Sequence, residues 1–152
     1  MTKELSIENI KKELINKISN NSEILEYFEN YLRDDDEKMT RYLKEYGMKY
    51  IKDNYIFPYD MATSGYCNFI TVEVTENELL ICGNIEKCFN VSIMIALEKY
   101  KDLDKISTLL GKIATELYPD RSNYRNTPYN IDCSYNQFTN KKLVRVVQFT
   151  IK

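Results

Sequence analysis

The spacing of apolar residues changes once along this chain, and that change constrains the fold more than any other feature. In the first third, apolar side chains recur every three or four residues, which is the period of an α-helix. Near Asn54 this pattern stops, and from residue 70 apolar side chains occupy every second position, the period of a β-strand. We therefore expect one α+β domain over 1–152, in which a helical region, 1–54, packs on a sheet region, 67–152.

The helical region divides into three expected helices. Ser6 is placed to cap the first, because its hydroxyl can accept a hydrogen bond from a free N–H of the first turn. Asn20 and Asn21 interrupt the apolar pattern, and Ser22 is placed to cap the second helix. The acidic residues 34–37 interrupt it again and favour the start of a third helix, since a helix N-terminus attracts negative charge.

Period-two stretches separated by turn-forming residues predict five strands after residue 67. A further helix, 103–117, ends at Pro119. The predicted order is ααα-βββ-α-ββ: a two-layer sandwich of helices on a mostly antiparallel sheet of about five strands, with one helix inserted between strands 3 and 4. The expected strands are 69–74, 78–82, 89–97, 131–135 and 143–151, with a turn at 75–77 and a polar loop at 120–130.

The order of the later elements, a helix, three strands, a helix and two strands, is similar to that of the small chaperones of bacterial secretion systems. The similarity is one of element order. No motif accompanies it, so it implies no site residue and no function for this chain.

The absence of histidine limits the chemistry available to this protein. Histidine is the commonest general base and metal ligand, and none occurs in the 152 residues. The four glycines are isolated, so no glycine-rich loop is present to bind phosphate, and the four cysteines form no C-x-x-C pair. We expect no cofactor, no metal site and no catalysis, with an enzyme that uses lysine or carboxylates as the remaining catalytic alternative.

Charge and hydropathy indicate the compartment and exclude some partners. The N-terminal residues lack the apolar segment of a signal peptide, and the densest apolar run, 91–97, is too short to cross a bilayer. We therefore expect a cytoplasmic protein that does not contact membranes. A net charge of −2 argues against direct nucleic-acid binding, which needs a basic face.

Acidic residues cluster between Ser22 and Glu37, where seven acids accompany only Arg33. One interpretation is a solvated helix face with a capping turn. The functional interpretation is a negative patch for a basic protein partner, which would speed and orient the encounter. The predicted partner-binding residues are Glu23, Glu26, Glu29, Asp34, Asp35, Asp36, Glu37, Tyr42 and Tyr46.

The two tyrosines belong to that set because Tyr42, Tyr46 and Tyr50 share one side of the third expected helix. Tyrosine is enriched at binding hot spots, although a core flank whose hydroxyls reach the surface explains the same spacing.

A second candidate site lies in the loop after Pro119. Arginine beside tyrosine can hold a phosphate or a flat ring, so a nucleotide- or phosphate-type ligand is the alternative to a protein partner. An ordinary surface loop explains the same residues. The alternative ligand-binding residues are Arg121, Tyr124, Arg125 and Tyr59.

These observations predict a small non-enzymatic binding protein, an inhibitor or adaptor that uses its acidic, tyrosine-flanked surface against a basic protein partner. A nucleic-acid-binding protein is one such partner. An accessory protein of a bacterium or its phage, including a counter-defence inhibitor, suits the composition. Homodimerisation is a further open alternative, because the β-branched C-terminal strand 143–151 could pair with a second copy if it lay at a sheet edge.

Overall fold

The structure is a computed structural model that describes residues 5–33, 49, 55–57, 69–97, 100–119, 122–135 and 138–151. Within these ranges it describes the backbone alone at 31–33, 57, 79, 81, 100–101, 122–135 and 138–143.

Helices and strands both contribute to the described chain, which confirms the predicted α+β class. The elements in chain order are α1 (Ile7–Ser19), α2 (Ser22–Arg33), β1 (Ile56–Phe57), β2 (Phe69–Ile81), β3 (Asn84–Ala96), α4 (Tyr100–Leu117), β4 (Ser122–Tyr135) and β5 (Phe138–Ile151).

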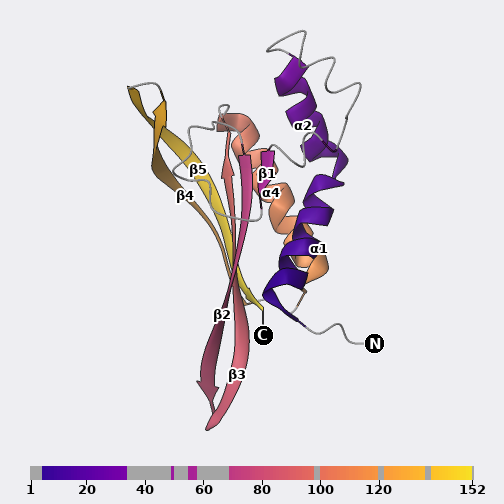
Figure 1. The fold of residues 1–152 in the computed structure, drawn as a ribbon, viewed down its shortest axis with the longest axis vertical. Coiled ribbons are helices and arrows are strands. Elements are labelled where there is room, and N and C mark those ends of the chain that lie inside the picture. Colours follow the sequence, from indigo (N-terminus) through magenta and orange to yellow (C-terminus); the bar gives the residue numbers. More distant parts are fainter. Residues whose placement is uncertain are drawn as a thin grey trace.

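The strands form one sheet in the order β1-β2-β3-β5-β4. The short β1 is parallel to β2, and the other neighbouring pairs are antiparallel. The helices α1, α2 and α4 lie on one side of this sheet, and the β2–β3 hairpin extends well beyond them (Figure 1). β3, which covers most of the expected strand 89–97, is central in the sheet, since it pairs with both β2 and β5.

Two strand boundaries differ from the prediction. The expected turn at 75–77 is wrong, because β2 runs unbroken through it, with Thr75 opposite Asn90 and Asn77 opposite Cys88. The chain turns at Cys82 and Gly83, within one residue of the turn that the sequence predicts after the strand 78–82, and their φ angles of 51° and 80° suit the two-residue turn that matches strand twist. Residues 75–78 are polar because this stretch of strand is exposed to solvent, and the chain does not turn there.

The C-terminal hairpin also departs from expectation. The predicted polar loop at 120–130 is wrong, since Ser122–Tyr135 forms β4 at one edge of the sheet, where polar residues and Pro128 are tolerated. The open alternative that the C-terminal strand lies at an edge is excluded, because β5 lies between β3 and β4. The third expected helix lies outside the described residues, apart from Lys49.

The first two helices begin where side chains satisfy free N–H groups. The backbone N–H of Asn9 donates to Ser6 Oγ at 3.1 Å, which confirms Ser6 as the cap of α1. For α2 the cap is Asn21 rather than Ser22, because Asn21 Oδ1 accepts from the N–H groups of Glu23 at 3.0 Å and Ile24 at 3.2 Å.

The main core forms between the helices and the inner face of the sheet. α1 packs against β2 and α4, and α4 packs against β3 and β5. Alternate residues of each strand point into this layer, so the period of two places one row per strand in the core. Members of the core include Ile10, Leu14, Phe28, Ile70, Val72, Val91, Ile93, Leu103, Leu110, Val147 and Phe149.

A polar contact ties the C-terminal end of α4 to α1. Tyr118, which is 8% exposed and lies against Phe149 with ring centroids 6.1 Å apart, donates its hydroxyl to Glu13 Oε2 at 2.9 Å. Burial first, and then the hydrogen bond to Glu13 and the charge of that carboxylate, raise the pKa of the Tyr118 hydroxyl above its ordinary value.

We expect Tyr118→Phe to lower the free energy of unfolding by about 1 kcal/mol, measured by urea denaturation near neutral pH. Because the folded state holds the Tyr118 proton above the ordinary tyrosine pKa of about 10, wild-type stability decreases as the pH rises past that value. The decrease should be smaller in Tyr118→Phe. Equal stability near neutral pH, or an unchanged alkaline decrease, would contradict this role for Tyr118.

Candidate functional site

The acidic side of α2 is the part of the predicted partner-binding surface that the structure describes. Glu23 and Glu26 are exposed, and Glu29 is half-buried. The opposite side of the helix is buried, with Ile24 and Phe28 inaccessible to solvent. One helix therefore carries an apolar stripe into the core and carboxylates into water.

The helix that bears these carboxylates is anchored at its start and middle. The Asn21 cap satisfies two N–H groups of its first turn. Farther along, the Phe28 ring has its centroid 5.4 Å from that of Tyr27 and 5.4 Å from that of Tyr55, next to β1. The exposed carboxylates are thus held on a packed scaffold rather than on a free segment.

The two exposed carboxylates of this helix, Glu23 and Glu26, face solvent. In the part of the chain that the structure describes, neither Glu23 nor Glu26 is in an ion pair. The remaining predicted members of the surface, Asp34, Asp35, Asp36, Glu37, Tyr42 and Tyr46, lie outside the described residues.

Two of the four residues of the alternative ligand site fall at the edge of the sheet. Tyr124 and Arg125 belong to β4, where the backbone alone is described, and Arg121 and Tyr59 lie outside the described residues. The backbone of Arg125 pairs with Gln148 of β5, next to a register shift between Ser122 and Arg125. The proposed juxtaposition of this segment with Tyr59 therefore stays a prediction.

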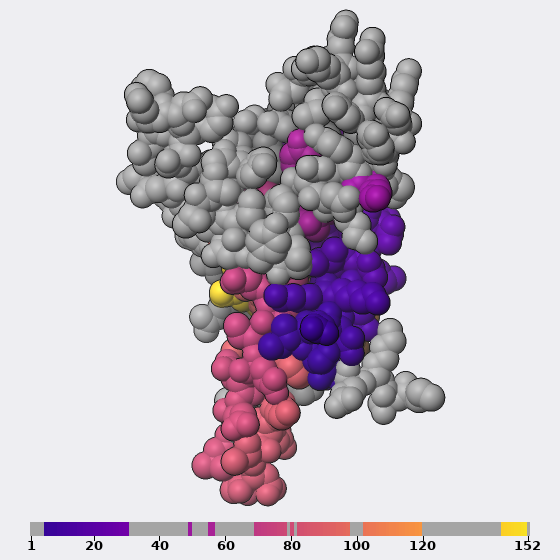
Figure 2. Space-filling model, viewed as in Figure 1, coloured from indigo at the N-terminus to yellow at the C-terminus, as the bar shows by residue number. Residues whose placement is uncertain are grey.

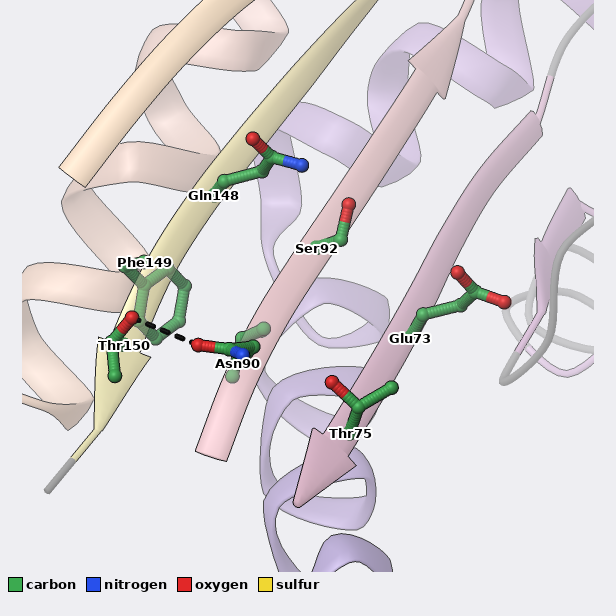
Figure 3. A pocket seen from close by; sticks show the side chains of 8 residues that line it. Glu73, Thr75, Asn90, Ser92, Gln148, Phe149 and Thr150 are labelled. Carbon is green, nitrogen blue, oxygen red and sulfur yellow. Dashed lines mark hydrogen bonds between the residues drawn. The ribbon is translucent and has the colours of Figure 1, made fainter. Parts of the chain in front are cut away.

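Gln148 itself lines a concave polar patch on the face of the sheet away from the helices. Two cross-strand rows build it, Glu73–Ser92–Gln148 and Thr75–Asn90–Thr150, around a space of about 520 Å³ (Figure 3). Thr150 Oγ1 donates to Asn90 Oδ1 at 3.0 Å.

The chemistry of this polar patch is that of hydroxyl and amide groups with one carboxylate. Among its described lining residues there is no lysine or arginine, so these residues by themselves do not favour phosphate. Sequence reasoning missed the patch because its members come from three strands. The only signal was the polar residue at alternate positions of each strand.

At the far end of β2 and β3 the hairpin continues beyond the rest of the sheet. The last residue of β3 paired with β5 is Phe89, opposite Ile151, so residues 77–88 form a two-stranded ribbon, here called the arm. Figure 2 shows the arm standing clear of the body. Its tip exposes Leu80 and Ile85, which face each other across the strands and are 75% and 69% exposed.

A groove of about 620 Å³ lies where the arm meets the start of α1. It is formed by Leu5, Ser6, Ile7 and Glu8 from the helix start, and by Glu76, Lys87 and Phe89 from the two strands. Lys87 Nζ lies 3.3 Å from Glu76 Oε1, in an ion pair whose side chains are 69% and 36% exposed. Sequence reasoning did not find this groove, because the expected turn at 75–77 removed the arm.

The described residues contain neither a cluster of metal ligands nor a disulfide. No group of three or more potential ligands gathers there. Cys82, exposed in the turn, and Cys88, buried opposite Asn77, are both free thiols that do not meet across the hairpin. None of the described helices is long and apolar enough to cross a membrane.

Comparison with known protein families, with curated proteins and with solved structures finds no match to this chain. Its function is therefore argued from its own residues.

We expect Asn21→Ala to destabilise α2 and to lower the free energy of unfolding by about 1 kcal/mol, because two N–H groups lose their acceptor. The matched control is Ser22→Ala, one position later, which should change stability by less than about 0.5 kcal/mol because Ser22 is not the cap. Urea denaturation of both variants measures the difference. A larger effect at Ser22 than at Asn21 would refute the assignment of the cap.

Proposed function

We propose that this chain is a small non-enzymatic protein-binding protein, an inhibitor or adaptor, that meets a basic protein surface with the acidic side of α2. The observation that supports this proposal is the pair of exposed, unpaired carboxylates Glu23 and Glu26 on a helix whose opposite side is buried at Ile24, Leu25 and Phe28.

A rigid acidic helix suits recognition for a physical reason. Its charges are presented without the entropic cost of ordering a loop, and they attract a basic surface over roughly the Debye length of about 8–10 Å. Charge of this kind raises the association rate and orients the partner more than it adds affinity. A partner surface of lysine and arginine is therefore the chemistry that complements α2.

Enzymatic function lacks a comparable basis. With no histidine in the chain, a catalytic site would need lysine, tyrosine or carboxylates brought together in a cleft. The described concavities hold Glu73 in one case, and Glu8, Glu76 and Lys87 in the other, all near solvent. These surroundings favour binding over chemistry.

The double variant Glu23→Lys, Glu26→Lys tests the proposal. We expect a basic protein captured from source-cell lysate by wild type to bind the variant at least about tenfold more weakly, because two attractions become repulsions. Binding of the purified partner should also weaken as salt increases. Titration by biolayer interferometry measures both effects.

The matched control carries the same charge change elsewhere, as Glu86→Lys, Glu116→Lys, at two exposed positions on β3 and α4. It should retain the partner. Equal loss in both double variants would show a nonspecific charge effect, and undiminished binding to the α2 variant would exclude α2 as the contact surface.

A further inference from the structure

The polar patch on the face of the sheet away from the helices gathers side chains that have few partners of their own (Figure 3). Thr150 donates to Asn90 across the strands. Within the part of the chain that the structure describes, the other polar members of the two rows form no hydrogen bond or ion pair: Glu73, Thr75, Ser92 and Gln148. Polar groups that converge on one concave space are a typical basis for a ligand site, and the volume of about 520 Å³ lies within the usual range of roughly 300–1,000 Å³.

The extent of the patch suits a small molecule. Its two rows span two strand-to-strand spacings, about 10 Å, in one direction and one two-residue step, about 7 Å, in the other. The next row on the same face is Thr71–Met94–Val146, in which Thr71 and Val146 are only 1% and 4% exposed. The accessible polar groups therefore end at a buried row on this side of the patch.

The orientation of Asn90 decides which ligands the patch can satisfy. Its Oδ1 accepts a hydrogen bond from Thr150, so its Nδ2 amino group, with two N–H donors, is the part left for a ligand. Glu73, in the other row, has a carboxylate that offers acceptors only. Covering a polar group without pairing it costs free energy, so a ligand that covers both residues has to carry donors as well as acceptors.

Charged and flat ligands fit this arrangement poorly. An ammonium or guanidinium group carries donors only and would leave the Asn90 amino group unpaired. A phosphate carries acceptors and negative charge, and it would meet Glu73 with no lysine or arginine among the described lining residues. A flat aromatic ligand would find no ring to stack on, because the Phe149 side chain is buried on the other face of the sheet, against Tyr118.

We propose that the patch is a binding site for a neutral, hydroxyl-rich small molecule, a mono- or disaccharide. A sugar hydroxyl both donates and accepts, as do the side chains of Thr75, Ser92 and Gln148, so each of these can pair with it. Neighbouring hydroxyls can donate to the two oxygens of Glu73, while others accept from the amino group of Asn90. The site lies on the opposite side of the sheet from α2 (Figure 1), so it is separate from the surface proposed for a protein partner.

Titration of the purified, ¹⁵N-labelled full chain by NMR is the first test. The probes are glucose, galactose, N-acetylglucosamine, maltose and lactose, each added up to about 50 mM. We expect a dissociation constant of about 1–10 mM for at least one of them, because the patch is open to solvent and offers no stacking ring. The side-chain amide signals of Asn90 and Gln148 should shift to saturation, whereas the backbone signals of α2 should not move.

The variant Asn90→Asp tests the hydrogen bonds directly. It keeps the shape of the side chain and the acceptor for Thr150, but it replaces the amino donor by a second acceptor. We expect the sugar to bind this variant at least about tenfold more weakly. The matched control Asn84→Asp makes the same change at an exposed residue of β3 outside the patch and should bind as wild type does. Circular dichroism confirms that both variants are folded.

The absence of saturable shifts at Asn90 and Gln148 with all of these sugars would overturn the proposal. Undiminished binding to Asn90→Asp, or an equal loss in Asn84→Asp, would overturn it as well. Spermidine and inorganic phosphate test the two charged classes, and tighter binding of either at the patch would assign it to that class instead. These titrations contain no other protein, so their outcome is independent of the partner proposed for α2.

Discussion

Burial of one face of β2, β3 and β5 is the constraint on which the rest of this structure depends. β2, β3 and β5 each direct alternate apolar residues toward α1 and α4, and residues such as Ile70, Ile93 and Val147 are completely buried there. At about 25 cal/mol per Å² of apolar surface, this layer is the largest favourable contribution to the fold. The helices have to cover it, and their outward sides are then left for solvent and for partners.

The surfaces with functional potential lie where that coverage ends. α2 extends the helical layer at one end of the molecule and shows carboxylates to solvent, while the arm leaves the layer at the other end. The other face of the sheet also has a buried part and an accessible part. The buried part contains Phe69, Ala96 and Val144, and the accessible part contains Glu73, Asn90 and Gln148.

Local patterns carried much of the prediction. The helix caps and the amphipathic stripes of α1 and α4 depend on interactions within a few residues or on a strict period, and these expectations were sound apart from the one-residue shift from Ser22 to Asn21. The structure of two polar stretches was predicted wrongly. Residues 75–77 and 122–130 look like a turn and a loop by composition, yet both are strand. Residues 75–77 are an exposed part of β2, and 122–130 belong to β4 at the edge of the sheet, where polar residues are tolerated.

The sequence alone therefore determined the α+β class, the apolar faces and the acidic helix, because side-chain periodicity and capping are local properties. Tertiary structure decided what depends on distant neighbours. It showed that β5 lies inside the sheet rather than at its edge, that six polar side chains from three strands share one patch, and that Leu80 and Ile85 stay exposed among the described residues. Whether an apolar residue is buried or exposed depends on what packs against it. The alternation along a strand shows which face a residue is on, but not how far the helices extend over that face.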